Sequence, residues 1–355
     1  MDTPQIISAD EWQSRALAGL DWLIRSIEAT GRKGSSHIFS RWRYPLSGWH
    51  LGYPETTGYI IETLLDYHPY FPELQLEDYA FDCGKWLLTQ QLGDGSFPSL
   101  LAGSQKPSFF NSGMIAFGLL RLQERKFDQK REESMSKLAE WVKKQLRDPI
   151  KFADNSSAYY SRAIWGFTLL SRHLKNESLE QILKDTTQQL SKNIKENAAV
   201  LNWGFDSGDV AYTHTMAYTW RGFLELGHLW NEHKWLESCK VCLKKLESEL
   251  NNSPFLAGEY DSNWNGNFQY RCVTGQAQCS LIAFRMFDST GEIRYSELGK
   301  KLMIAIIPDQ RKGKFDPQLK GAIPGSVPLW GPYMRGKYPN WAVKFYLDGL
   351  IRIKK

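Results

Sequence analysis

The sequence of 355 residues has no uninterrupted apolar run of about 18 residues, the length that a helix needs to cross a membrane. Its first residues lack a basic region followed by an apolar stretch, the pattern of a secretory signal. It also lacks a dense block of one charge, because its 44 basic and 39 acidic side chains are spread along the chain. We therefore expect a cytoplasmic protein with no membrane span and no nucleic-acid partner.

The sequence also contains few cysteines. The sequence has five cysteines, an odd number: Cys83, Cys239, Cys242, Cys272 and Cys279. Cys239 and Cys242 form a lone C-x-x-C pair inside an amphipathic helical pattern. Buried reduced thiols are the simpler interpretation, with a zinc site as the alternative. We expect no metal and no cofactor.

A repeated pattern dominates what is present. A polar or aromatic loop runs into an apolar helix six times, about 48 to 66 residues apart, which is the spacing of a repeated supersecondary unit. The six copies lie at Gly52–Glu62, Phe110–Met114, Tyr159–Ala163, Tyr212–Met216, Cys272–Gln276 and Tyr338–Ala342. Units that repeat from end to end predict one domain over residues 1–355, in which each unit buries its apolar face on its neighbours.

Helical periodicity predicts two alternating classes of helix. Helices of the first class keep one charged face and are expected over residues 10–30, 77–91, 131–146, 179–197, 233–250 and 294–307. Helices of the second class are apolar nearly all round and are expected over residues 56–67, 111–123, 157–174, 212–228, 274–287 and 340–353. A helix covered on both sides must be apolar all round, so the second class should form an inner ring. The prediction is an all-α (α/α)6 toroid of six helical hairpins, with the inner-helix N-termini on one rim.

In this repeat the chain resembles the α/α-toroid superfamilies. These are the six-hairpin glycosidases with related polysaccharide lyases and uronyl C5-epimerases, and more weakly the terpenoid cyclases and protein prenyltransferases. The turn Gln91–Phe97 is similar to the Gln-to-Trp turn of terpenoid cyclases with Phe97 in place of Trp, and a Gly-x-aromatic turn also occurs in carbohydrate-active toroids. The sequence has neither the Asp-rich motifs nor the zinc ligands that isoprenoid chemistry needs, so the resemblance favours a sugar substrate.

Side chains suited to sugars gather at the loop-to-helix junctions. Sugars need flat aromatic faces for their C–H surfaces, and amides, carboxylates or cations for their hydroxyl and acid groups. Helix N-termini there would also favour a uronate carboxylate. The predicted substrate-binding residues are Trp49, His50, Tyr53, Asp94, Arg162, Trp264, Arg271, Gln276, Trp330, Tyr333, Tyr338, Asn340, Trp341 and Lys344. Several of these aromatics have the alternative role of wedging loops together.

The candidate catalytic residues are Glu55, Asp209, His214 and Tyr212. Glycosidases pair two carboxyl groups, whereas lyases and epimerases need a base and a proton donor. His214, near the start of an inner helix, is expected to have a pKa suited to proton transfer. Helix capping by the carboxylates and packing of the histidine are the alternatives. We predict an enzyme that processes a glycan or polysaccharide intermediate, with surface-polysaccharide biosynthesis as one setting. A noncatalytic glycan-binding or assembly protein, or an isoprenoid enzyme, is the alternative.

Overall fold

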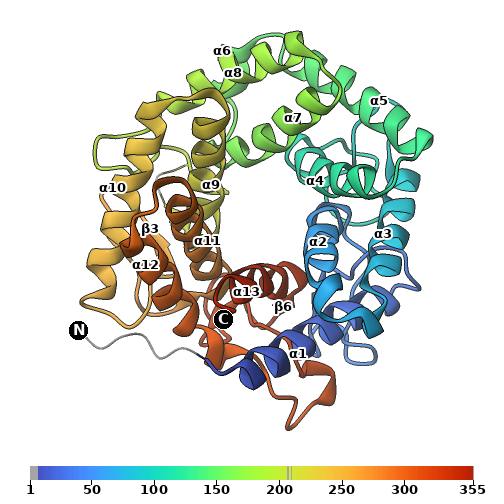
Figure 1. Ribbon diagram of the computed structural model, residues 1–355, viewed down its shortest axis with the longest axis vertical. Coiled ribbons are helices and arrows are strands. Elements are labelled where there is room, and N and C mark those ends of the chain that lie inside the picture. Colours follow the sequence, from blue (N-terminus) through green and yellow to red (C-terminus); the bar gives the residue numbers. More distant parts are fainter. Residues whose placement is uncertain (1–6, 206–207, 209, 355) are drawn as a thin grey trace.

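The computed structural model describes residues 7–205, 208 and 210–354 as a closed ring of two concentric layers of helices (Figure 1). The inner layer contains α2 (Pro54–Tyr67), α4 (Phe109–Arg125), α7 (Ser161–His173), α9 (Thr213–Trp230), α11 (Val273–Thr290) and α13 (Asn340–Arg352). The outer layer contains α1 (Ala9–Glu28), α3 (Leu76–Gln90), α5 (Gln129–Gln145), α8 (Glu177–Ser191), α10 (His233–Leu250) and α12 (Ile293–Ile304). The predicted toroid, with its inner and outer helices, is confirmed.

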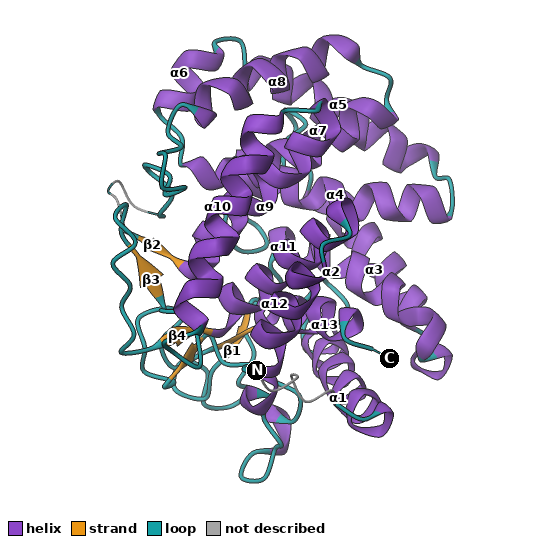
Figure 2. Ribbon diagram, turned by 60° about the vertical axis from the view of Figure 1, so that its left-hand side comes forward, coloured by secondary structure: helices purple, strands orange, loops and turns teal. Residues whose placement is uncertain are grey.

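Short strands connect the loops on one side of the ring. Three antiparallel pairs form there: β1 (Ile38–Phe39) with β6 (Tyr338–Pro339), β2 (Ala211–Tyr212) with β3 (Glu259–Tyr260), and β4 (Arg271–Cys272) with β5 (Ser326–Val327). Figure 2 shows them gathered on the same face, the face on which inner helices begin. The strand pairs therefore join the loops into one rim around the helix N-termini.

Some elements differ from the sequence-based expectation. A short helix, α6 (Pro149–Asp154), lies in the outer layer beside α8 and was not predicted (Figure 1). Single turns of 3-10 helix occur at His68–Tyr70, Pro72–Leu74, Ala158–Tyr160, Ile307–Asp309 and Pro317–Leu319. Helix α8 ends at Ser191 rather than at 197, because the chain then turns back through a bridge between Ile194 and Val200.

Local signals set several helix ends. The Ser108 and Asp128 side chains cap α4 and α5 by accepting hydrogen bonds from backbone N–H groups of the first turn. Asn231 and Gly291 end α9 and α11 in the left-handed conformation, with φ of 57° and 71°.

No described helix combines the length and the apolar character that a membrane crossing requires.

Glycines bring neighbouring inner helices into close contact. A Cβ atom at Gly118 of α4 would overlap the carbonyl oxygen of Gly58 in α2, and one at Gly166 of α7 would overlap that of Gly113 in α4. Glycines of α9 and α11 likewise lie against the backbone of the preceding inner helix. Neighbouring inner helices therefore pack with their backbones in direct contact.

The first and last elements close the ring. The indole N–H of Trp12 in α1 donates to the Leu350 carbonyl of α13 at 2.9 Å, and the Tyr67 hydroxyl of α2 donates to the Leu347 carbonyl at 2.7 Å. The pairing of β1 with β6 makes the same connection at the rim. A large hydrophobic cluster of buried side chains is drawn from helices all around the ring.

Candidate active site at the centre of the ring

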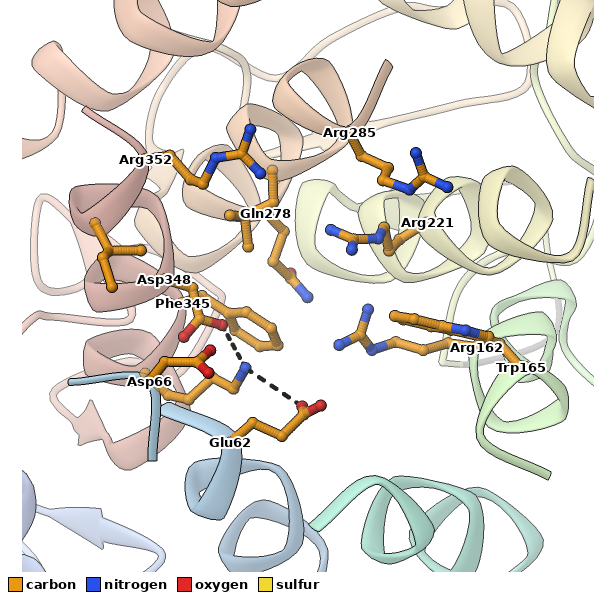
Figure 3. A pocket seen from close by; sticks show the side chains of 13 residues that line it. Glu62, Asp66, Arg162, Trp165, Arg221, Gln278, Arg285, Phe345, Asp348 and Arg352 are labelled. Carbon is orange, nitrogen blue, oxygen red and sulfur yellow. Dashed lines mark hydrogen bonds and ion pairs between the residues drawn. The ribbon is translucent and has the colours of Figure 1, made fainter. Parts of the chain in front are cut away.

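The inner ring encloses two cavities, each of about 210 Å³. The first, called the N-terminal cavity here, is lined by the first turns of α2, α4, α9 and α13 and by the 3-10 turn before α7. The second, called the C-terminal cavity, is lined by later turns of α2, α9, α11 and α13, together with Arg162 and Trp165 of α7 (Figure 3). The ring therefore has two chambers along its axis.

Glu55 is a buried carboxyl group in the N-terminal cavity. It stands in the first turn of α2, directly after Pro54 at the start of the helix, and only 8% of it is exposed. Burial raises its pKa from 4.5 to about 7, although hydrogen bonds from Tyr53 and Tyr59 and the positive charge of Arg162 partly oppose this effect. Both protonation states of Glu55 are therefore populated near neutral pH.

His214 lies in the same cavity, in the first turn of α9. Its Nδ1 is 2.7 Å from the Gln278 amide oxygen, which can only accept, so the proton lies on Nδ1 and leaves Nε2 unprotonated. Burial lowers the pKa of His214 to about 3. This corrects the expected pKa suited to proton transfer at neutral pH: His214 is a neutral hydrogen-bonding group.

Aromatic rings make up most of the cavity wall. They are contributed by Tyr53, Tyr59, Phe110, Tyr159, Tyr160, Phe205, Tyr218, Tyr333 and Trp341. The indole N–H of Trp341 donates to the Tyr333 hydroxyl at 2.7 Å, and the Tyr218 hydroxyl donates to that of Tyr59 at 3.4 Å. The cavity thus combines flat apolar faces with hydroxyls around one buried carboxyl group.

No family model matches this sequence, and no curated protein matches it. Solved structures do match. An unsaturated glucuronyl hydrolase from Bacillus sp. GL1 aligns over 97% of this chain and 97% of its own, with 12% identity and a TM-score of 0.72. One from Streptococcus agalactiae aligns over 99% of this chain and 93% of its own, with 12% identity and a TM-score of 0.72. An alpha-amylase from Clostridium perfringens aligns over 96% and 97%, with 16% identity and a TM-score of 0.66. The chain shares its (α/α)6-toroid fold with these proteins.

The predicted site residues divide into four groups. Tyr53, Glu55, His214, Tyr333 and Trp341 line the N-terminal cavity. Arg162 and Lys344 line the C-terminal cavity instead. Asp209 lies outside the described residues. The others belong to neither cavity: Tyr212, Trp49, His50, Asp94, Trp264, Arg271, Gln276, Trp330, Tyr338 and Asn340.

Most residues of this last group have other contacts. Trp49 packs on Trp22 and Phe39, with ring centroids 5.0 and 4.9 Å away, and therefore wedges a loop against α1. The Trp264 indole donates to the Asn197 carbonyl at 2.9 Å, and Gln276 donates to that of Leu302 at 3.0 Å. Arg271 forms an ion pair with Asp309, and Asp94 accepts from Ser96 within the turn at the end of α3.

The remaining members lie at the rim. Asn340 is fully buried and donates to the hydroxyls of Ser35 and Thr56 at 2.8 and 2.9 Å. The Tyr212 ring lies 5.2 Å from that of Tyr333, directly behind the cavity wall, and the His50 ring lies 4.6 Å from that of Tyr44. Tyr338 lines a separate surface pocket with Arg311, and Trp330 is 72% exposed.

Sequence reasoning missed several cavity residues. Tyr59 and Tyr218 stand four residues after Glu55 and His214, so each pair shares one helix face. That spacing was a usable signal, because a tyrosine in an otherwise apolar helix needs a partner for its hydroxyl. Other missed residues of the N-terminal cavity are His37, Thr56, Ser108, Phe110, Asn111, Tyr159, Tyr160, Phe205 and Met334.

The cysteines line neither cavity. All five cysteines are free and buried. Over the described ranges, no three His, Cys, Asp or Glu side chains are grouped in a way that could hold a metal ion.

Glu55→Gln should change how stability depends on pH. As pH rises from 4.5 to about 7, the folded protein keeps a proton on Glu55 that the unfolded chain has released, so the free energy of unfolding falls. The loss is roughly 1.4 kcal/mol per pH unit, about 3 kcal/mol in all. Glu55→Gln lacks this titration and should gain stability relative to the parent at about pH 8 but not at about pH 4. Urea unfolding at both values measures the difference, and parallel pH curves would contradict the prediction.

Proposed function

We propose that this chain is a carbohydrate-active enzyme that processes a glycan in the N-terminal cavity, with Glu55 as the group that transfers a proton. The observation that carries the proposal is the burial of Glu55 among aromatic rings, which raises its pKa to about 7. A carboxyl group with this pKa can act as an acid or as a base at neutral pH.

The lining supports a sugar as the substrate. Ring faces such as those of Phe110, Tyr160 and Trp341 suit the C–H surfaces of a pyranose, and Ser108 and Asn111 suit its hydroxyl groups. Inner-helix N-termini surround the cavity and favour an anionic group, so we propose a saccharide that carries a uronate. In agreement, two structures of similar fold hold the saccharides dGlcA-GalNAc6S and dGlcA-Glc-Rha-Glc.

Two reaction types are consistent with Glu55. In a hydrolase its protonated form would give a proton to the glycosidic oxygen as the bond to carbon breaks. In a lyase or epimerase its ionised form would take the proton from the carbon next to the uronate carboxylate. Asp209, which lies outside the described residues, stays our candidate for the second carboxyl group that an ordinary glycosidase needs. His214 and Tyr212 would position the substrate or Tyr333.

A noncatalytic glycan-binding protein is the second candidate. The observation that favours it is that Glu55 is the sole carboxylate among the described residues that line the N-terminal cavity. Binding and catalysis would use the same aromatic walls, so only product formation separates them.

Incubation with a panel of oligosaccharides, with and without uronates, tests the proposal. We expect mass spectrometry to detect cleavage or elimination, and NMR in deuterated water to detect epimerisation, for at least one uronate-bearing member. Calorimetry on the same panel measures binding independently. Binding without any product would favour the glycan-binding protein, and neither binding nor product would contradict both candidates.

A further inference from the structure

We propose that the C-terminal cavity is a second binding site, specific for a small molecule that carries one carboxylate, and that Arg162 and Gln278 bind that carboxylate. This site is separate from the glycan site proposed above and does not depend on it. Figure 3 shows both side chains pointing into the cavity from different helices, α7 and α11.

Arg162 is a buried cation that forms no close ion pair with a described carboxylate. Only 6% of it is exposed, and no described carboxylate lies within 4.0 Å of its guanidinium group. Its Nε atom has no hydrogen-bond partner in the part of the chain that the structure describes. Rings of Tyr218, Trp165 and Phe345 surround the guanidinium at 5.0, 5.4 and 5.5 Å and hold it by cation–π attraction. Rings accept no strong hydrogen bonds, so the guanidinium donors stay available to a ligand.

Gln278 supplies a second unused donor. It is 3% exposed, and its amide oxygen is occupied by His214 at 2.7 Å. Its Nε2 atom is buried and has no hydrogen-bond partner among the described residues. A buried amide donor without a partner costs roughly 1 to 3 kcal/mol, so a bound acceptor would relieve that cost. This cavity is distinguished by two buried hydrogen-bond donors, from different helices, that have no described partner.

The other cations of the cavity already have partners. Arg352 donates two hydrogen bonds to Asp288, at 2.8 and 2.6 Å. Arg221 and Arg285 share Glu225, at 2.7 and 3.1 Å. Lys344 forms an ion pair with Asp348 and lies 4.0 Å from Glu62 (Figure 3). An anion would therefore bind at Arg162 rather than at the other basic side chains.

The charge, shape and size of the cavity indicate the class of ligand. Glu62, Asp66 and Asp348 also line it, and their carboxylates would repel a multiply charged ion such as phosphate or sulfate. A planar guanidinium matches a planar carboxylate. A volume of about 210 Å³ admits a small organic acid.

The two cavities are separated by a layer of side chains. Tyr59 and Tyr218 line the N-terminal cavity and are hydrogen-bonded to each other at 3.4 Å, while Phe345 lines the C-terminal cavity 5.6 Å from the Tyr59 ring. His214 and Gln278 form a similar pair across the layer. A ligand in one cavity therefore touches different residues from a ligand in the other.

Calorimetric titration of the full chain with sodium glucuronate tests the proposal, with inorganic phosphate and sulfate as comparison anions. We expect one glucuronate to bind per chain, and phosphate and sulfate to bind at least tenfold more weakly. Arg162→Met should weaken glucuronate binding about tenfold to a hundredfold, because it removes charged hydrogen bonds. The matched control Arg352→Met, in the same cavity but already paired with Asp288, should change binding less than about threefold.

A second variant covers the case in which Arg162→Met fails to fold. Gln278→Glu keeps the oxygen that His214 contacts, but places a carboxylate beside Arg162 and so occupies the site. It should abolish glucuronate binding while the melting temperature stays equal or rises. Tyr53→Phe, in the N-terminal cavity, should leave this binding unchanged. Four outcomes would overturn the proposal: no binding at millimolar glucuronate, equal binding of phosphate, equal losses in Arg162→Met and Arg352→Met, or a loss confined to Tyr53→Phe.

Discussion

Glu55→Gln should lower the turnover of a uronate-bearing oligosaccharide by about 10² to 10⁴, while its dissociation constant changes by less than about threefold. The carboxamide occupies nearly the same volume and can still accept from Tyr53 or Tyr59, so the shape of the cavity is kept. It can neither give nor take a proton at neutral pH. Such a loss of rate corresponds to about 3 to 5 kcal/mol of transition-state stabilisation with little loss of ground-state binding. Steady-state kinetics and calorimetry on one saccharide measure the two effects.

Glu62→Gln is the matched control. Glu62 lies seven residues further along α2, and burial raises the pKa of its carboxyl group as well, but it faces the C-terminal cavity. Its replacement should leave turnover within about threefold of the parent if the chemistry takes place in the N-terminal cavity. Equal losses of turnover in the two variants would contradict the assignment. A loss confined to affinity in Glu55→Gln would favour the glycan-binding protein.

The ring could be predicted from the sequence because its cause is periodic. Six copies of one loop-to-helix pattern, with one helix class apolar all round, leave few other ways to bury the apolar faces. The closure between α1 and α13 follows from the same requirement. Departures occur where the pattern is short or interrupted, as in α6 and at the early end of α8.

The cavity residues were harder to predict because an aromatic residue at a loop-to-helix junction can either pack on a neighbouring element or face the cavity. Trp49 and Trp341 both lie beside the start of an inner helix, yet Trp49 packs on Trp22 while Trp341 faces the cavity. The choice depends on which loop lies next to the residue in space, and no local pattern encodes that. Residues on regular helix turns, such as Tyr59 and Tyr218, could have been found by extending the helical period from Glu55 and His214.

The presence of two cavities was not predicted either, because the sequence pattern indicated a single site. Arg162 was predicted as a substrate-binding residue of that site because it stands near an inner-helix N-terminus. Its long side chain instead lines the C-terminal cavity, which Gln278 of α11 also lines. Which cavity a side chain lines depends on the direction and length of that side chain, and repeat spacing contains neither.

The inner ring itself yields the last prediction: Gly118→Ala should destabilise the protein by about 1 to 3 kcal/mol. In an exposed helix this change would stabilise by about 1 kcal/mol, because alanine is the better helix former. In α4 the new methyl group would overlap the Gly58 carbonyl oxygen, which is backbone and cannot move aside without shifting α2. The free energy lost to overpacking of this kind exceeds the free energy gained from the higher helix propensity of alanine. Urea unfolding measures the difference.

Gly93→Ala provides the control with the opposite sign. Gly93 lies in the turn after α3, its φ is not positive, and a Cβ atom there would have no neighbour within 4 Å. Alanine should stabilise the protein by about 0.4 to 1 kcal/mol, because it reduces the freedom of the unfolded chain. Opposite signs for the two variants would locate the constraint at the contact between α2 and α4. A stabilised Gly118→Ala variant would mean that α2 and α4 can move apart at little cost and would contradict the prediction.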